Sequence, residues 1–116
     1  MREYELSPHR YRELKHFCMQ YKDFKRELKL LQSTDGYLKK HYDPTSELAI
    51  REHELVNAIE LIEMTARETE DFLSERILKV VTEDLNINGL TMPCSRECME
   101  ELRRRYFYLL HKRKGV

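Results

Sequence analysis

The chain has 116 residues, enough for one domain with a modest core. Charged residues make up 36% of the sequence and glycine occurs only three times, which favours long solvent-exposed helices and argues against a sheet protein. The first residues lack the apolar stretch of a signal peptide, and no apolar run reaches the ~18 residues that would span a membrane, so the sequence predicts a cytoplasmic protein without a membrane partner.

The formal net charge of zero conceals three segments of different sign. Residues 1–42 carry ten Lys and Arg against six Asp and Glu, a charge of +4. Residues 43–93 carry four against twelve, a charge of −8, and residues 94–116 carry seven against three, a charge of +4. The chain is therefore basic at both ends and acidic in the middle, which its neutral isoelectric point conceals.

The pattern predicts an all-α fold, a small bundle of about four helices forming a single domain over residues 1–116. A long N-terminal helix and a loop fill residues 1–42; the helix begins at Ser7-Pro8, a cap followed by proline, and runs to about Gln32. Its apolar residues alternate at spacings of three and four, a heptad seam that predicts a helical partner either in the same chain or in a dimer. The seam consists of Leu14, Phe17, Tyr21, Phe24, Leu28 and Leu31.

The second helix is expected over residues 43–68, with Asp43-Pro44 as its start. The third is expected to begin near Thr69, with two acidic residues in its first turn. The second and third helices could also form one bent rod. The predicted core sides are Leu48, Leu55, Ile59, Ile62 and Ala66 in the second helix, and Leu73, Ile77, Val80 and Val81 in the third.

Residues 69–116 are expected to form a helix-turn-helix-like unit. Its connection, Asp84 to Pro93, is rich in turn formers but apolar enough for one short helical turn, and Ser95 caps the last helix. One face of that helix is predicted to hold the core; it consists of Cys98, Leu102, Tyr106 and Leu109. The outward side carries Arg96, Glu100, Arg103 and Arg104, whereas Arg105 at the edge is expected to be structural.

Outward arginines on a capped helix favour DNA as the partner, because the guanidinium fork matches phosphates and the guanine edge. Arg96, Arg103 and Arg104 would approach DNA, and Ser95, Met99 and Glu100 would lie near base edges. Phosphate contacts from Arg10, Arg12, Lys39 and Lys40 would require the N-terminal segment to fold beside the last helix. The DNA hypothesis therefore predicts one contiguous basic surface made by both ends of the chain.

No catalytic arrangement is found, and the sequence predicts neither an enzyme nor a bound cofactor or metal. The cysteines, Cys18, Cys94 and Cys98, lack zinc-ligand spacing and are interpreted as reduced thiols that act as small apolar residues. Cys94 lies just before the last helix, where the dipole would lower a thiol's pKa, but no histidine lies beside it in the sequence.

Several stretches resemble small prophage proteins of Firmicutes, most specifically the opening Leu6 to Tyr21. Further similarity lies in Ile59 to Glu63, Pro93 to Arg96 and Arg103 to Leu110. That group is distantly similar to phage late-transcription regulators of the RinA and ArpU type, in which a helical part precedes a sigma-factor-like helix-turn-helix. The resemblance implies that Ser95 to Arg104 starts the recognition helix and that DNA, and RNA polymerase beside it, are partners. Asp84 to Pro93 departs from the pattern, since the usual Ile-Ala-x-x-Leu-Gly stretch is missing.

An alternative function belongs to another class: a helical adaptor or assembly protein, of the kind used in phage packaging and morphogenesis. In that hypothesis the heptad seam and the aromatics off the core of the last helix form a protein interface, with a homodimer as one expected outcome. Oligomeric state together with DNA affinity separates the two hypotheses.

Overall fold

The computed structural model describes residues 5–33, 47–83 and 95–115. These ranges form five helices: α1 (Pro8–Met19), α2 (Tyr21–Ser33), α4 (Glu47–Thr69), α5 (Ser74–Glu83) and α6 (Arg96–Lys114). The prediction of an all-α fold is confirmed. Among the described helices, none has the length and apolar character needed to cross a bilayer.

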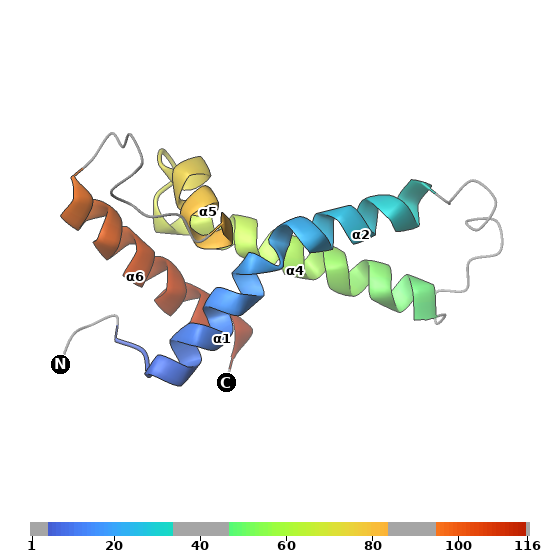
Figure 1. The fold of residues 1–116 in the computed structure, drawn as a ribbon, viewed down its shortest axis with the longest axis horizontal. Helices are drawn as coiled ribbons and strands as arrows, with labels where there is room; N and C mark the ends of the chain where they lie inside the picture. Colours follow the sequence, from blue (N-terminus) through green and yellow to red (C-terminus); the bar gives the residue numbers. More distant parts are fainter. Residues whose placement is uncertain (1–4, 34–46, 84–94, 116) are drawn as a thin grey trace.

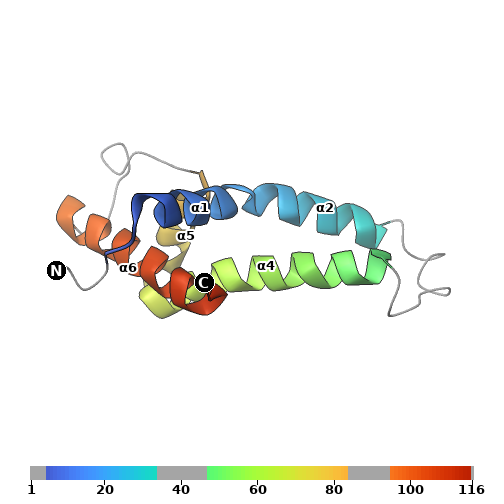
Figure 2. The ribbon, with the colours of Figure 1, turned by 90° about the horizontal axis from the view of Figure 1, so that it is seen from below.

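The helices form two regions, which Figures 1 and 2 show one after the other along the long axis of the molecule. An arm consists of α2 packed along residues 47–61 of α4. A body consists of α1, α5 and α6 gathered around residues 62–69 of α4. The arm projects away from the body, which gives the molecule extents of 52 × 31 × 21 Å.

The predicted long first helix is wrong in one respect, because it is broken at Gln20 into α1 and α2. Ser7 caps α1 as expected, accepting a hydrogen bond from the backbone N–H of Arg10 at 3.2 Å. Gln20 has φ −84° and ψ 0°, and its N–H donates to the Phe17 carbonyl in a tight turn. The bend allows α1 to pack on α5 and α6 while α2 stays on α4.

The heptad seam finds its partners within the chain. Leu14 packs in the body core, and Tyr21 is 5% exposed and donates a hydrogen bond to Glu63 on α4. The other seam residues are half-buried. In the arm, Glu27 of α2 forms an ion pair with Arg51 of α4 at 2.7 Å. The seam residues therefore pack against other helices of the same chain.

The second and third predicted helices are separate, and the third begins later than expected. Thr69 ends α4, where its hydroxyl donates to the Thr65 carbonyl at 2.8 Å, and a turn leads to Ser74 at the start of α5. The predicted start of α4 at Asp43-Pro44 lies outside the described residues. Leu48 is wrong as a core residue, being 45% exposed, whereas the other predicted core residues of both helices are buried.

Tyr106 lies at the centre of the body core and is fully buried. Its hydroxyl donates to the carbonyl of Ile62 at 3.1 Å and lies 3.6 Å from the Cys18 sulfur. Burial raises the pKa of the Cys18 thiol to about 12, although the hydrogen bond with Tyr106 opposes the rise. Cys18 thus acts as a small apolar residue, as predicted.

Candidate nucleic-acid interface

The last helix begins where the sequence predicts. The Ser95 side chain accepts a hydrogen bond from the N–H of Cys98 at 3.1 Å, and Glu97 lies in the first turn, where the helix dipole favours an anion. The segment before Ser95, including Cys94 and the predicted connection, lies outside the described residues. The predicted helix-turn-helix geometry therefore stays a prediction.

The buried face of α6 is rotated from the predicted one. Cys98 is exposed and Leu109 is only half-buried, while Leu102 and Tyr106 are buried as expected. The buried set is Met99, Leu102, Tyr106, Phe107 and Leu110. Two apolar patterns run along this helix one residue apart, and contacts with α1, α4 and α5 select the one that buries the larger side chains.

Met99 was expected near base edges, and the structure corrects that prediction. The Met99 side chain is 0% exposed and belongs to the body core. A fully buried side chain has no access to a base edge in the folded protein. Ser95 stays exposed, and Glu100 is half-buried.

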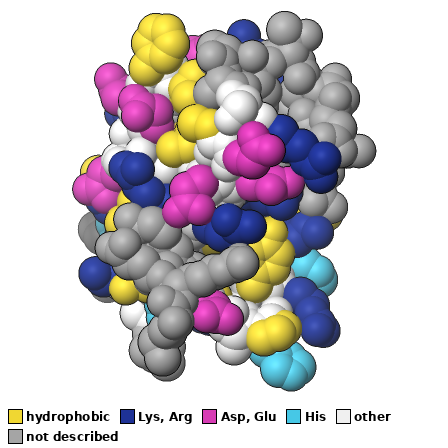
Figure 3. Space-filling model, turned by 90° about the vertical axis from the view of Figure 1, so that its left-hand side faces the viewer, with side chains coloured by type: hydrophobic (Ala, Val, Ile, Leu, Met, Phe, Trp, Pro, Cys, Tyr) yellow, Lys and Arg dark blue, Asp and Glu magenta, His cyan; other side chains and the backbone are white. Residues whose placement is uncertain are grey.

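Two of the predicted DNA-contacting arginines are paired with glutamates of their own helix. Arg96 contacts Glu100 at 3.2 Å, and Arg104 contacts Glu101 at the same distance. Residues 95–104 contain three Arg and three Glu, so this half of α6 has no net charge. Figure 3, which shows the side of the molecule where α6 begins, has Lys and Arg mixed with Asp and Glu.

The other end of α6 has a different character. Residues 105–115 contain four Lys and Arg and no Asp or Glu. Arg105 donates to the Thr69 carbonyl at 2.7 Å, which confirms its structural role. Arg113 pairs with Glu68 of α4, whose pKa is lowered by that hydrogen bond.

The start of α1 lies against this end of α6. Arg10 donates from Nε to Nδ1 of His111 at 2.8 Å and from Nη2 to the Gly115 carbonyl at 2.6 Å. The rings of Tyr11 and Phe107 meet edge to face at 5.0 Å. Arg12, two residues after Arg10 on α1, is exposed. These contacts join the two basic segments of the chain at one place.

Two lysines of the last turn lie over aromatic rings. The Lys114 ammonium is 3.8 Å from the Phe17 ring centroid, and that of Lys112 is 5.4 Å from the Tyr108 centroid. Both lysines are exposed. We call the start of α1 together with the last turn of α6 the basic end; its basic residues are Arg10, Arg12, His111, Lys112, Arg113 and Lys114.

The predicted contact residues therefore fall into separate groups. Arg10 and Arg12 belong to the basic end, and Lys39 and Lys40 lie outside the described residues. At a rise of about 1.5 Å per residue, Arg104 lies about 10 Å and Arg96 about 22 Å from His111 along α6, so both are separate from the basic end. The basic tail of α6 can be recognised in the sequence. That it lies beside Arg10 of α1 is seen only in the structure.

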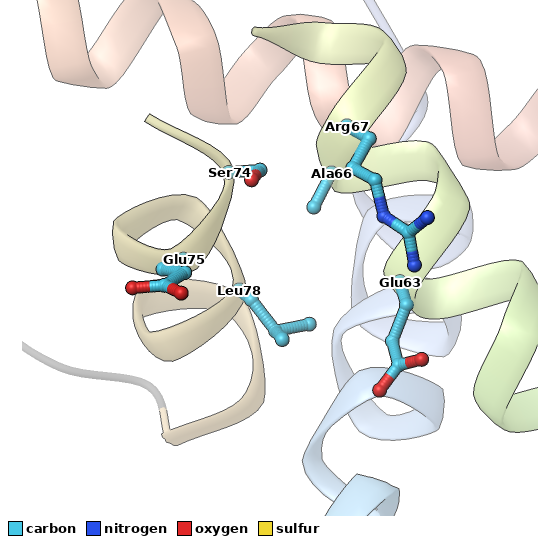
Figure 4. A pocket seen from close by; sticks show the side chains of 6 residues that line it. All are labelled: Glu63, Ala66, Arg67, Ser74, Glu75 and Leu78. Atoms are coloured by element: carbon cyan, nitrogen blue, oxygen red, sulfur yellow. The ribbon is translucent and has the colours of Figure 1, made fainter. Parts of the chain in front are cut away.

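A shallow open hollow of about 260 Å³ lies between α4 and α5 (Figure 4). Arg67 and Glu63 line it from α4, and Leu78 projects into it from α5. Glu63 already accepts a hydrogen bond from Tyr21. The remaining lining residues are Ala66, Ser74 and Glu75. The charged residues of the lining are two glutamates and one arginine, so the hollow does not attract anions. The basic end is therefore the stronger candidate for binding nucleic acid.

Within the described ranges, no three His, Cys, Asp or Glu side chains come together in a way that would hold a metal ion. Comparison with known proteins adds no relative: no family model, no curated protein and no solved structure matches this chain.

Proposed function

We propose that the protein binds double-stranded DNA through the phosphate backbone, using the basic end. The observation that supports it best is that Arg10 donates hydrogen bonds to His111 and to the Gly115 carbonyl, which places the start of α1 beside the basic last turn of α6. Residues 7–16 carry three Lys and Arg against one Glu, and residues 105–115 carry four against none. Two of these arginines are paired with carboxylates, Arg10 with Glu13 and Arg113 with Glu68.

Phosphate binding suits this surface better than base reading does. Lysine and arginine side chains neutralise phosphates and release counterions, a term that does not depend on sequence. The first half of α6, proposed from the sequence as the recognition helix, is electrically balanced and has Met99 in the core. Binding is accordingly proposed to be strong in its salt dependence and weak in its discrimination between sequences.

A role in phage transcription, with RNA polymerase as a second partner, is the biological context that we propose for this activity. Its support is the sequence resemblance alone. The adaptor alternative has less support, because Leu14 and Tyr21 of the heptad seam and Phe107 are buried within the chain.

The test is fluorescence anisotropy of a random-sequence duplex, titrated at several salt concentrations with wild type and two variants. Arg12→Ala/Lys112→Ala removes two exposed cations of the basic end. The control, Arg96→Ala/Arg103→Ala/Arg104→Ala, removes three from the balanced half of α6. We expect the first variant to reduce the slope of log K against log salt by about 2, and the control to stay near wild type.

Two outcomes would contradict the proposal. Absence of binding at low salt, where non-specific affinity should reach about 10⁻⁶ M, would exclude DNA as a partner. A large loss in the control with none in the first variant would return the contact to the start of α6. Circular dichroism of both variants establishes that the helices are intact.

A further inference from the structure

The outward face of α2 carries a row of cations. Residues 21–33 contain four Lys and Arg against two Asp and Glu. At about 100° per residue, all four cations fall within an arc of about 100°, on the side turned away from the half-buried Phe24, Leu28 and Leu31. All four cations are exposed. They are Lys22, Lys25, Arg26 and Lys29.

Carboxylates offset only part of the charge of this row. Lys22 pairs with Glu83 of α5 at 3.3 Å, and Arg26 pairs with Asp23 at 3.5 Å. The other acid of α2 is held by Arg51 of α4. Within the described ranges, the remaining two lysines of the row form no ion pair, and one of them lies over an aromatic ring. Two positive charges of the row are therefore not neutralised.

Aromatic rings connect the row to the basic end. The Lys114 ammonium lies 3.8 Å from the Phe17 ring centroid, and the Phe17 ring centroid lies 5.8 Å from that of Phe24 on α2. Figure 2 shows α1 and α2 one after the other along one side of the molecule, with α4 and α6 below them in that view. The last turn of α6 therefore reaches the junction between α1 and α2.

The two sides of the molecule also differ in charge. Residues 8–33, which include α1 and α2, contain seven Lys and Arg against three Asp and Glu. Residues 47–69, which form α4, contain two against six. A phosphate backbone is attracted to the first side and repelled by the second. The charge difference thus favours one direction for a long polyanion that leaves the basic end.

We propose that bound DNA continues from the basic end along the outward faces of α1 and α2, so that the row on α2 contacts phosphates of the same duplex. This step rests on the DNA binding proposed above. Arg12 and Lys29 are seventeen residues apart, which is at most about 25 Å at a rise of about 1.5 Å per residue. That path corresponds to about seven base pairs at about 3.4 Å each, so it passes several phosphates of each strand.

Salt-dependent binding of a random-sequence duplex longer than this path tests the proposal. Lys25→Gln/Lys29→Gln removes the two charges of the row that have no ion pair and keeps long polar side chains. We expect this variant to reduce the slope of log K against log salt by about 2, because each phosphate contact contributes about 0.9. The control Arg96→Gln/Arg104→Gln removes the same charge from the start of α6, and we expect it to keep the wild-type slope.

A combined variant separates this proposal from the DNA binding on which it rests. Adding Arg12→Ala/Lys112→Ala to Lys25→Gln/Lys29→Gln is expected to reduce the slope by about 4, because both sets contact one duplex. If only the basic-end substitutions lower the slope, the path along α2 is overturned and binding at the basic end stands. An equal loss in the control would trace the effect to net charge and would also overturn the path. Failure of wild type to bind would remove both proposals. Circular dichroism establishes that the helices of each variant are intact.

Discussion

The arm and the body of this molecule are both made of helices, but they are held together differently. In the body, side chains from α1, α4, α5 and α6 converge on one core centred on the fully buried Tyr106 and Phe107. In the arm, α2 buries only Tyr21, and residues 47–61 of α4 bury only Leu55 and Ile59. Leu30 and Leu48 are left largely exposed there.

The difference teaches where stability resides. Side chains in a core formed by several helices are shielded from water on all sides. Two paired helices share a single interface, and the side chains at its edges stay exposed to solvent. We therefore expect the arm to open locally at a lower free energy than the body, as regions with few buried apolar contacts do.

The largest expected effect comes from the body core. Phe107→Ala removes a ring that is 2% exposed and lies against Tyr11 and Tyr106, and we expect it to lower the free energy of unfolding by about 3–5 kcal/mol. Leu28→Ala, at a half-buried position of the arm, should cost about 1 kcal/mol. Chemical denaturation measures both; equal losses would show that arm and body are equally well packed.

A smaller effect is expected from the hydroxyl at the centre of the body. Tyr106→Phe keeps the ring but removes the donor to the Ile62 carbonyl and the partner of the Cys18 sulfur. The expected loss is about 1–2 kcal/mol, because both groups stay buried. Comparison of denaturation midpoints with wild type measures it. An unchanged midpoint would show that the body core tolerates the unpaired groups.

The smallest effect concerns the ion pair of the arm. Arg51 lowers the pKa of the Glu27 carboxyl through their hydrogen bond, so this contribution is present above the usual carboxyl range and is lost as pH falls through the lowered value. We expect Arg51→Ala at neutral pH to speed amide hydrogen exchange in α2 and leave α6 unchanged. Acidification is expected to act on both helices, because the pKa of Glu68, which holds Arg113 of α6, is also lowered. Equal acceleration of α2 and α6 by Arg51→Ala would contradict a separately opening arm.

Much of this fold follows from the sequence because its signals are local. Ser7 and Ser95 cap helices as their positions predict, and the periodic apolar residues of α5 are buried. The break at Gln20 has no such signal, since neither proline nor glycine marks it. It arises because α1 and α2 pack against different partners, which only the assembled structure decides.

The candidate site was less predictable for a related reason. In α6 two apolar patterns overlap, and the tertiary contacts that bury Met99 rather than Cys98 are invisible in the helix alone. The charges themselves were visible, but the pairing of Arg96 and Arg104 with nearby glutamates depends on side-chain placement. Spacing gives the phase of a helix only when one face is clearly more apolar than the others.

The contact between Arg10 and Gly115 joins positions 105 apart in sequence, and Cys18 meets Tyr106 across 88. During synthesis, α1 emerges from the ribosome long before the residues that cover it exist. The side chains of α1 that are buried in the folded protein, including Leu14 and Cys18, therefore stay exposed until α6 has been synthesised. The arm can pair as soon as α4 is complete, so the helix pair with less burial is expected to form first and the body to close last.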